Sequence, residues 1–181
     1  MKNRLEIFRI VLSSIFLALA IILPFITVNN PSLGNMFCLM HFPILLCGFF
    51  CGWKYGLLIG VVAPLLRSFI VGMPPMFPTA ICMSAELGVY GLLTGILYLV
   101  LPKKKRYLYL NLLISIISGK LIWGIMMFSL LSFDISKFGV TAFFIEGIVN
   151  AIPGIILQFA LIPVLVMIYE KIGLTKHNTN I

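Results

Sequence analysis

Residues 41–70 read HFPILLCGFFCGWKYGLLIGVVAPLLRSFI, and this stretch decides the fold. Two apolar runs, about 40–51 and 55–71, lie on either side of Lys54, and glycines recur every four residues at positions 48, 52, 56 and 60. Small residues at this spacing let helices approach closely in lipid. The first run is too short to cross a bilayer upright, because a span takes about 20 residues. The stretch therefore predicts a short apolar helix followed by a membrane-spanning one.

The composition of the whole chain is that of a membrane protein. Of its 181 residues, 61% are hydrophobic and 10% are charged, and the mean hydropathy is +1.15. A soluble domain has about 25% charged residues, and disorder requires low hydrophobicity, so both classes are excluded. Further apolar runs cover about 7–28, 79–101, 108–131 and 140–172. We predict an all-α integral membrane protein of six transmembrane helices, the second of them short, in a single domain over residues 1–181.

Positive charge is concentrated on one side of this plan, and Lys137 alone falls on the other. Basic residues are enriched in the cytoplasmic loops of membrane proteins, so we expect both termini in the cytoplasm. The net charge of +8 is then a topology signal and not a nucleic-acid surface. We expect the plasma membrane of a bacterium as the location. The residues on the basic side are Lys2, Arg4, Arg9, Lys54, Lys103, Lys104, Lys105, Arg106, Lys171 and Lys176.

Four ionisable residues fall inside predicted spans, where a charge is costly and marks a functional site by default. At a rise of about 1.5 Å per residue, all four lie in the outer half of the membrane. We therefore predict an outward-facing polar pocket for a small polar organic molecule. The alternative is two structural ion pairs, Arg67 with Glu86 and Lys120 with Glu146, that bind nothing. The candidate substrate-binding residues are these four and their neighbours, namely Arg67, Glu86, Tyr90, Lys120, Trp123, Glu146, Asn150 and His41.

No enzymatic motif is present in the sequence. Gly119-Lys120 lacks the upstream glycine and the following Ser or Thr of a phosphate-binding loop, so the chain has no ATPase motif of its own. Cys38-x-x-His41 is half a metal site at most, and we predict neither a metal nor a cofactor. Two turn-rich loops, 29–32 and 72–78, are either a rim over the pocket or stiff connectors.

The stretch at 41–70, with Pro43 and its four-spaced glycines, and MFPTAICMSAELGVYGLLTGILY at 76–98 resemble the S components of energy-coupling factor (ECF) vitamin transporters. The length and the six-span plan are similar as well. The resemblance implies capture of a water-soluble vitamin from outside. The loaded subunit then docks on a transmembrane coupling protein driven by two cytoplasmic ATPase subunits. The family's Ala-x-x-x-Ala docking pattern corresponds to Ser14 and Ala18 here, whose alternative role is internal packing.

The substrate is a separate question. Arg67 and Lys120 favour a carboxylate such as pantothenate, which is our first candidate. Glu86 and Glu146 favour heterocycles instead, of the pyridoxine, thiamine-precursor or queuosine-precursor kind. The N-terminus Met1-Lys2-Asn3 lacks the Met-x-His pattern of nickel and cobalt members, which disfavours those ions. Two other classes stay open: a membrane scaffold or assembly protein with no ligand, and a proton-coupled carrier.

Overall fold

The computed structural model describes residues 2–27, 37–131 and 143–171, and the regular structure in these ranges is helical. The longer elements are α1 (Lys2–Ile22), α3 (His41–Cys51), α4 (Trp53–Val71), α5 (Ile81–Val100), α6 (Lys105–Leu130) and α8 (Ile152–Lys171). Shorter helical segments are η1 (Leu23–Thr27), η2 (Met76–Ala80), η3 (Phe143–Ile148) and η4 (Val149–Ala151).

Five helical stretches in the described ranges are long and apolar enough to cross a membrane. They are Arg4–Ile26, Trp53–Val71, Met76–Val100, Lys105–Leu130 and Phe143–Lys171. The shorter apolar helix His41–Cys51 accounts for the short second run expected from the sequence. The prediction of an all-helical membrane protein is confirmed, with five full-length candidate spans and one short helix.

Proline and glycine set several helix ends. Pro24 lacks an N–H and clashes with the preceding turn, and α1 changes there into the tighter η1. Gly72 has φ +75° and closes α4 with its N–H donating to the Ser68 carbonyl at 2.9 Å. Gly52 has φ +91° and separates α3 from α4. A Cβ added at Gly52 would meet no described atom within 4 Å, so its positive φ is what favours glycine there. Its backbone still packs against α5, because a Cβ added at Gly95 would lie 2.9 Å from the Gly52 carbonyl carbon.

The other glycines on this pattern bring backbones together around α5. A Cβ added at Gly56 would overlap the Gly91 carbonyl, and one added at Gly60 would overlap the backbone of Leu87. At the far end of α5, a Cβ on Gly95 would overlap the backbone of Trp53. The packing role predicted for Gly56 and Gly60 is confirmed. Close contact with α4 fixes the position of α5, the helix that carries the buried Glu86.

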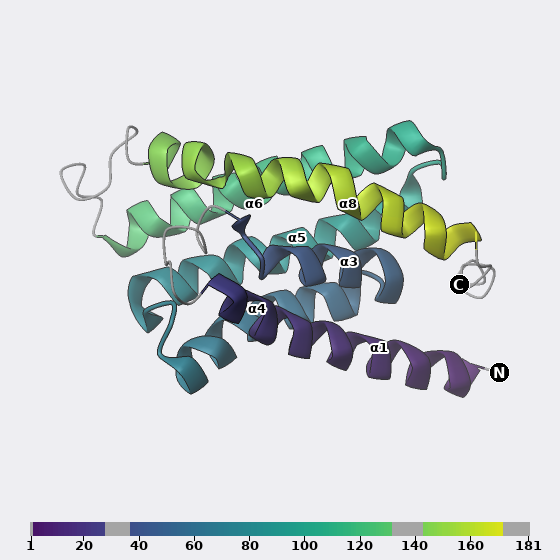
Figure 1. Cartoon of the computed structure of the whole chain (residues 1–181), viewed down its shortest axis with the longest axis horizontal. Helices are drawn as coiled ribbons and strands as arrows, with labels where there is room; N and C mark the ends of the chain where they lie inside the picture. Colours follow the sequence, from purple (N-terminus) through teal and green to yellow (C-terminus); the bar gives the residue numbers. More distant parts are fainter. Residues whose placement is uncertain (1, 28–36, 132–142, 172–181) are drawn as a thin grey trace.

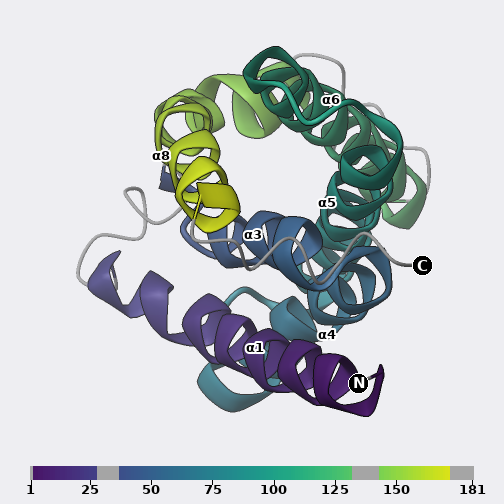
Figure 2. The same cartoon turned by 90° about the vertical axis from the view of Figure 1, so that its right-hand side faces the viewer.

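The helices run side by side in alternating directions (Figure 1). The start of α1, the α3–α4 junction, the α5–α6 junction and the end of α8 lie at one end of the bundle. Viewed along the bundle, α3, α5, α6 and α8 surround a common axis, and α1 and α4 lie outside this ring (Figure 2). With 11 residues, α3 is roughly 16 Å long. Its first residue, His41, is therefore placed inside the bundle and is 5% exposed.

Candidate functional site

A buried group of polar and aromatic side chains joins α3, α5 and α6, and we call it the Glu86 cluster. The Glu86 carboxylate is 2.7 Å from the Lys120 ammonium and 3.5 Å from Nε2 of His41. The Tyr90 hydroxyl donates to the same carboxylate at 2.7 Å. The Lys120 Nζ lies 5.8 Å from the centre of the Trp123 ring. The Glu86 cluster comprises His41, Glu86, Tyr90, Lys120 and Trp123.

Helical periodicity and two small residues hold these side chains in place. Tyr90 follows Glu86 by one turn of α5, and Trp123 follows Lys120 by one turn of α6, so each pair shares a helix face. Gly119 leaves space for Tyr90, because a Cβ there would overlap the phenol ring. Trp123 packs beside Gly147 of η3, where an added Cβ would lie 3.0 Å from the indole. The cluster therefore depends on close approach of α6 to both α5 and η3.

His41 has unmet hydrogen-bonding capacity. Its two ring nitrogens are buried and have no hydrogen-bond partner in the described part of the chain. The 3.5 Å separation of Nε2 from Glu86 is too long for a good hydrogen bond. A buried donor or acceptor without a partner costs about 1–3 kcal/mol, and native proteins rarely leave one. Among the described residues of the Glu86 cluster, His41 is thus the side chain that most clearly lacks a hydrogen-bond partner.

Cys38 belongs to the same neighbourhood and was not among the predicted binding residues. It is 8% exposed, and both Lys120 and Glu86 act on it electrostatically. Burial raises the pKa of the Cys38 thiol to about 11, so the group is a neutral thiol near pH 7. The Cys38-x-x-His41 spacing was the signal that indicated it. A neutral, buried thiol contributes packing and a weak hydrogen-bond donor.

Three predicted site residues are not found in the Glu86 cluster. Arg67 and Asn150 lie elsewhere, and the side chain of Glu146 is not described. Arg67 is half-buried on α4, with its guanidinium 5.7 Å from the centre of the Phe25 ring. The structural pairing of Arg67 with Glu86 is wrong, because Glu86 pairs with Lys120. Asn150 is exposed on η4. Glu146 lies in η3, and its side chain is outside the described part of the structure.

A second set of buried polar groups continues from the Glu86 cluster along α5, and it was not predicted from the sequence. Thr94 bonds to the Tyr90 carbonyl at 2.7 Å, and its own carbonyl accepts from Asn111 at 3.0 Å. Ser115 donates to Asn111 at 3.2 Å, and Tyr98 donates to Glu170 at 2.7 Å. The four-residue spacing of 86, 90, 94 and 98 was the available signal. The hydroxyl and amide groups of this second set have partners, in contrast to His41.

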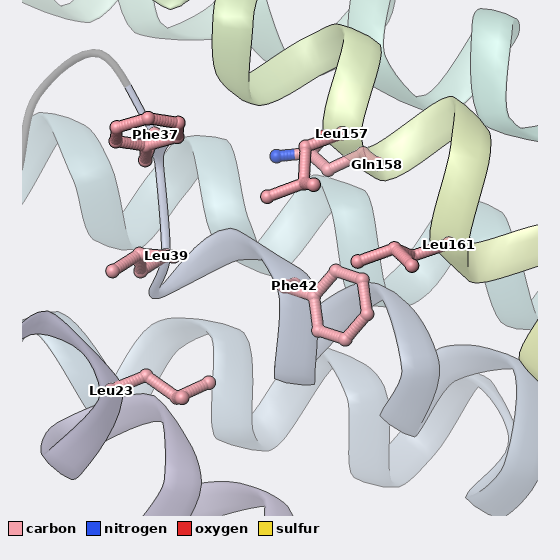
Figure 3. Close-up of a pocket in the computed structure, with 7 residues that line it drawn as sticks. All are labelled: Leu23, Phe37, Leu39, Phe42, Leu157, Gln158 and Leu161. Carbon is pink, nitrogen blue, oxygen red and sulfur yellow. The ribbon is translucent and has the colours of Figure 1, made fainter.

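A cavity of about 170 Å³ lies between η1, the start of α3 and α8. Figure 3 shows the side chains that surround it. Gln158 is the one polar residue in a lining otherwise made of Leu and Phe. The cavity contains none of the predicted site residues and does not have the polar groups that a vitamin-like molecule requires. Its lining residues are Leu23, Phe37, Leu39, Phe42, Leu157, Gln158 and Leu161.

Ser14 and Ala18 are exposed on α1. The Ser14 hydroxyl donates to the Ile10 carbonyl of its own helix at 2.9 Å. The buried face of α1 carries Ser13, Phe16 and Ala20 instead. The alternative prediction, that Ser14 and Ala18 pack inside the protein, is therefore wrong for the described part of the molecule.

Residues 8–166 match the family described as ECF transporter, substrate-specific component. No curated protein and no solved structure matches the chain. Proteins of this family are membrane subunits that bind a small-molecule substrate and work with the other transporter components; they are not enzymes themselves. The resemblance read from residues 41–70 and 76–98 is thus confirmed, and the match covers most of the chain. The chain belongs to the family of ECF transporter substrate-specific components.

Proposed function

We propose that the Glu86 cluster binds the transported substrate. The observation that carries this proposal is His41, whose buried ring nitrogens have no hydrogen-bond partner among the described residues and lie beside an ion pair that is itself nearly inaccessible. A ligand that hydrogen-bonds to the imidazole removes this cost on binding. The cluster also combines a cation, a carboxylate and aromatic rings, which suits a small polar molecule with a flat body.

A purely structural role fits the cluster less well. If Glu86 and Lys120 served only to hold α5 to α6, the pair would need no third titratable side chain. The second polar set, which includes Thr94 and Asn111, already links these helices with paired groups. The unpartnered imidazole therefore favours a binding component over a scaffold without a ligand.

The distribution of charge supports an outward-facing site. Arg4, Lys54, Lys103 and Lys171 are exposed at the helix ends that share one end of the bundle (Figure 1). Basic residues mark the cytoplasmic side, so this end faces the cytoplasm and both termini lie there. The Glu86 cluster lies in the first half of α5 and the second half of α6, away from this basic end. The protein then takes its substrate from outside, in the plasma membrane of a bacterium.

Ser14 and Ala18 form the proposed docking face for the transmembrane coupling protein. Both residues are exposed on α1, which lies outside the ring of helices that holds the Glu86 cluster (Figure 2). Small side chains allow a partner helix to approach closely in lipid. As the family resemblance implies, two cytoplasmic ATPase subunits then supply the energy for uptake.

The second part of the proposal concerns the identity of the vitamin or precursor that is bound. Pantothenate was the first candidate because Arg67 and Lys120 together offered two cations to its carboxylate. In the structure Arg67 packs on Phe25, and the charge of Lys120 is matched by Glu86. These contacts support the pyridoxine-like, thiamine-precursor and queuosine-precursor heterocycles over pantothenate.

The test is a thermal-shift screen of the purified protein in detergent against vitamins and their precursors. A ligand at 1,000 times its dissociation constant adds about 4 kcal/mol of stability. We expect one compound to give a large shift that Lys120→Met abolishes. The matched variant Arg67→Met removes a cation outside the cluster and should retain the shift. A well-folded sample that responds to no compound would favour the scaffold.

A further inference from the structure

The charge balance of the Glu86 cluster limits what it can bind. Glu86 and Lys120 are 2.7 Å apart, with 2% and 13% of their side-chain surfaces exposed. Each charge is already compensated in a medium where an unpaired charge is expensive. An anionic ligand would have to displace Glu86 from Lys120 or leave a carboxylate without a counter-ion. Arg67, the other cation of the predicted pocket, lies on α4 outside the Glu86 cluster. Its guanidinium is 5.7 Å from the centre of the Phe25 ring in η1, and its buried Nε has no hydrogen-bond partner in the described part of the chain.

The hydrogen-bond donors and acceptors of the Glu86 cluster define which groups a bound ligand must present to it. The contacts from Lys120, His41 and Tyr90 all reach Oε1 of Glu86, and none of them uses Oε2. Among the described residues no contact to Oε2 is found, so this oxygen can accept a hydrogen bond from a ligand. Lys120 has three N–H groups and His41 has two unpartnered nitrogens, so donors stand beside that acceptor. The cluster therefore presents an acceptor and a donor next to each other.

Aromatic rings determine the shape of the ligand. The His41 and Tyr90 rings are 5.5 Å apart at their centres, and the centre of the Trp123 ring is 5.8 Å from the Lys120 Nζ. All three residues are less than a tenth exposed. Buried aromatic faces favour a flat ring over an extended flexible chain.

We infer that the Glu86 cluster selects an uncharged heterocycle that carries a cyclic amide or amidine edge. The ring N–H or amino group donates to Glu86, and the adjacent carbonyl oxygen or ring nitrogen accepts from Lys120 or His41. The inference rests on the proposed function, because it assumes that this cluster is the substrate site. It excludes carboxylate anions as the preferred class.

The test is calorimetry on the purified protein in detergent with two sets of probes. The first set is cytosine, guanine and 4-amino-2-methylpyrimidine, and the second is nicotinate, orotate and pantothenate. We expect at least one base to bind at least about tenfold more tightly than any carboxylate. Methylation of the donating nitrogen of that base should weaken its binding by at least about tenfold, because Glu86 loses its donor.

A charge-removing variant gives a signature that misfolding does not mimic. Glu86→Gln leaves Lys120 without its counter-ion, so base affinity should fall while carboxylate affinity rises. Preferential binding of a carboxylate to the unsubstituted protein would overturn the inference and leave the proposed function intact. Binding of neither set would also overturn it, and the wider vitamin screen would then decide separately whether the chain is a binding component.

Discussion

Two tyrosines on α5 make nearly identical hydrogen bonds, and replacing each by phenylalanine separates binding from stability. Tyr90 donates to Glu86 at 2.7 Å within the Glu86 cluster, and Tyr98 donates to Glu170 at 2.7 Å near the other end of the helix. Both phenols are buried, at 1% and 8% exposure. A hydrogen bond to a charged group contributes about 1.5–3 kcal/mol in soluble proteins and less in membrane proteins. Each substitution should thus cost about 1–2 kcal/mol of stability.

Substrate affinity should distinguish the two variants. Tyr90→Phe frees the Glu86 carboxylate to move, so affinity for the substrate should fall about tenfold, which is about 1.4 kcal/mol. Tyr98→Phe should leave affinity unchanged, since Tyr98 lies two turns from Tyr90. Thermal unfolding in detergent measures stability, and titration calorimetry with the compound from the vitamin screen measures affinity. Equal loss of affinity in both variants, or none in Tyr90→Phe, would refute the placement of the site.

Three further predictions concern the supports of the site and the docking face. Gly56→Ala should lower the unfolding temperature, because its Cβ meets the Gly91 carbonyl. Gly119→Ala should weaken substrate binding by pushing Tyr90 away from the carboxylate, and in calorimetry its effect should not add to that of Tyr90→Phe. Ala18→Leu should leave binding unchanged and reduce ATP-driven uptake in proteoliposomes containing the full transporter.

Each of these predictions has a contrary outcome. Unchanged stability in Gly56→Ala would mean that α4 and α5 are further apart than described. Full additivity of Gly119→Ala with Tyr90→Phe would mean that the glycine acts through another contact. Normal uptake by Ala18→Leu would remove α1 from the docking surface. In the uptake assay, Leu19→Ala on the same exposed helix is the matched control and should behave normally.

Most helices were predictable because a bilayer demands long apolar runs, and charges and prolines interrupt them visibly. The last span was predicted in extent but not in detail. The sequence indicated one run over about 140–172, and a single candidate span covers Phe143–Lys171, but within it η3 and η4 precede α8. Gly147 lies against Trp123 of α6 there, and this contact between distant parts of the chain is invisible in a linear pattern. Pro153 near the start of α8 is a local sign of the break.

The depth of the site residues in the membrane could be predicted from the sequence, but the direction in which each side chain points could not. A fixed rise per residue placed Glu86 and Lys120 in one layer, and they are in contact. The same arithmetic placed Arg67 at that level, yet its side chain faces Phe25. Rotation about the helix axis depends on packing, which for α4 is set by the close approach of Gly56 and Gly60 to α5. Which side chains contact each other between helices could therefore be determined only from the structure.

The most direct test of the substrate site is the amount of ligand bound per protein in two matched variants, Glu86→Gln and Glu170→Gln. Each removes one carboxylate charge that accepts a tyrosine hydroxyl at 2.7 Å, at opposite ends of the same bundle. After saturation with the compound found in the vitamin screen and removal of the excess, mass spectrometry of the released ligand gives the stoichiometry. We expect close to one ligand per protein in Glu170→Gln and almost none in Glu86→Gln. Full occupancy of Glu86→Gln would contradict the assignment of the Glu86 cluster as the substrate site.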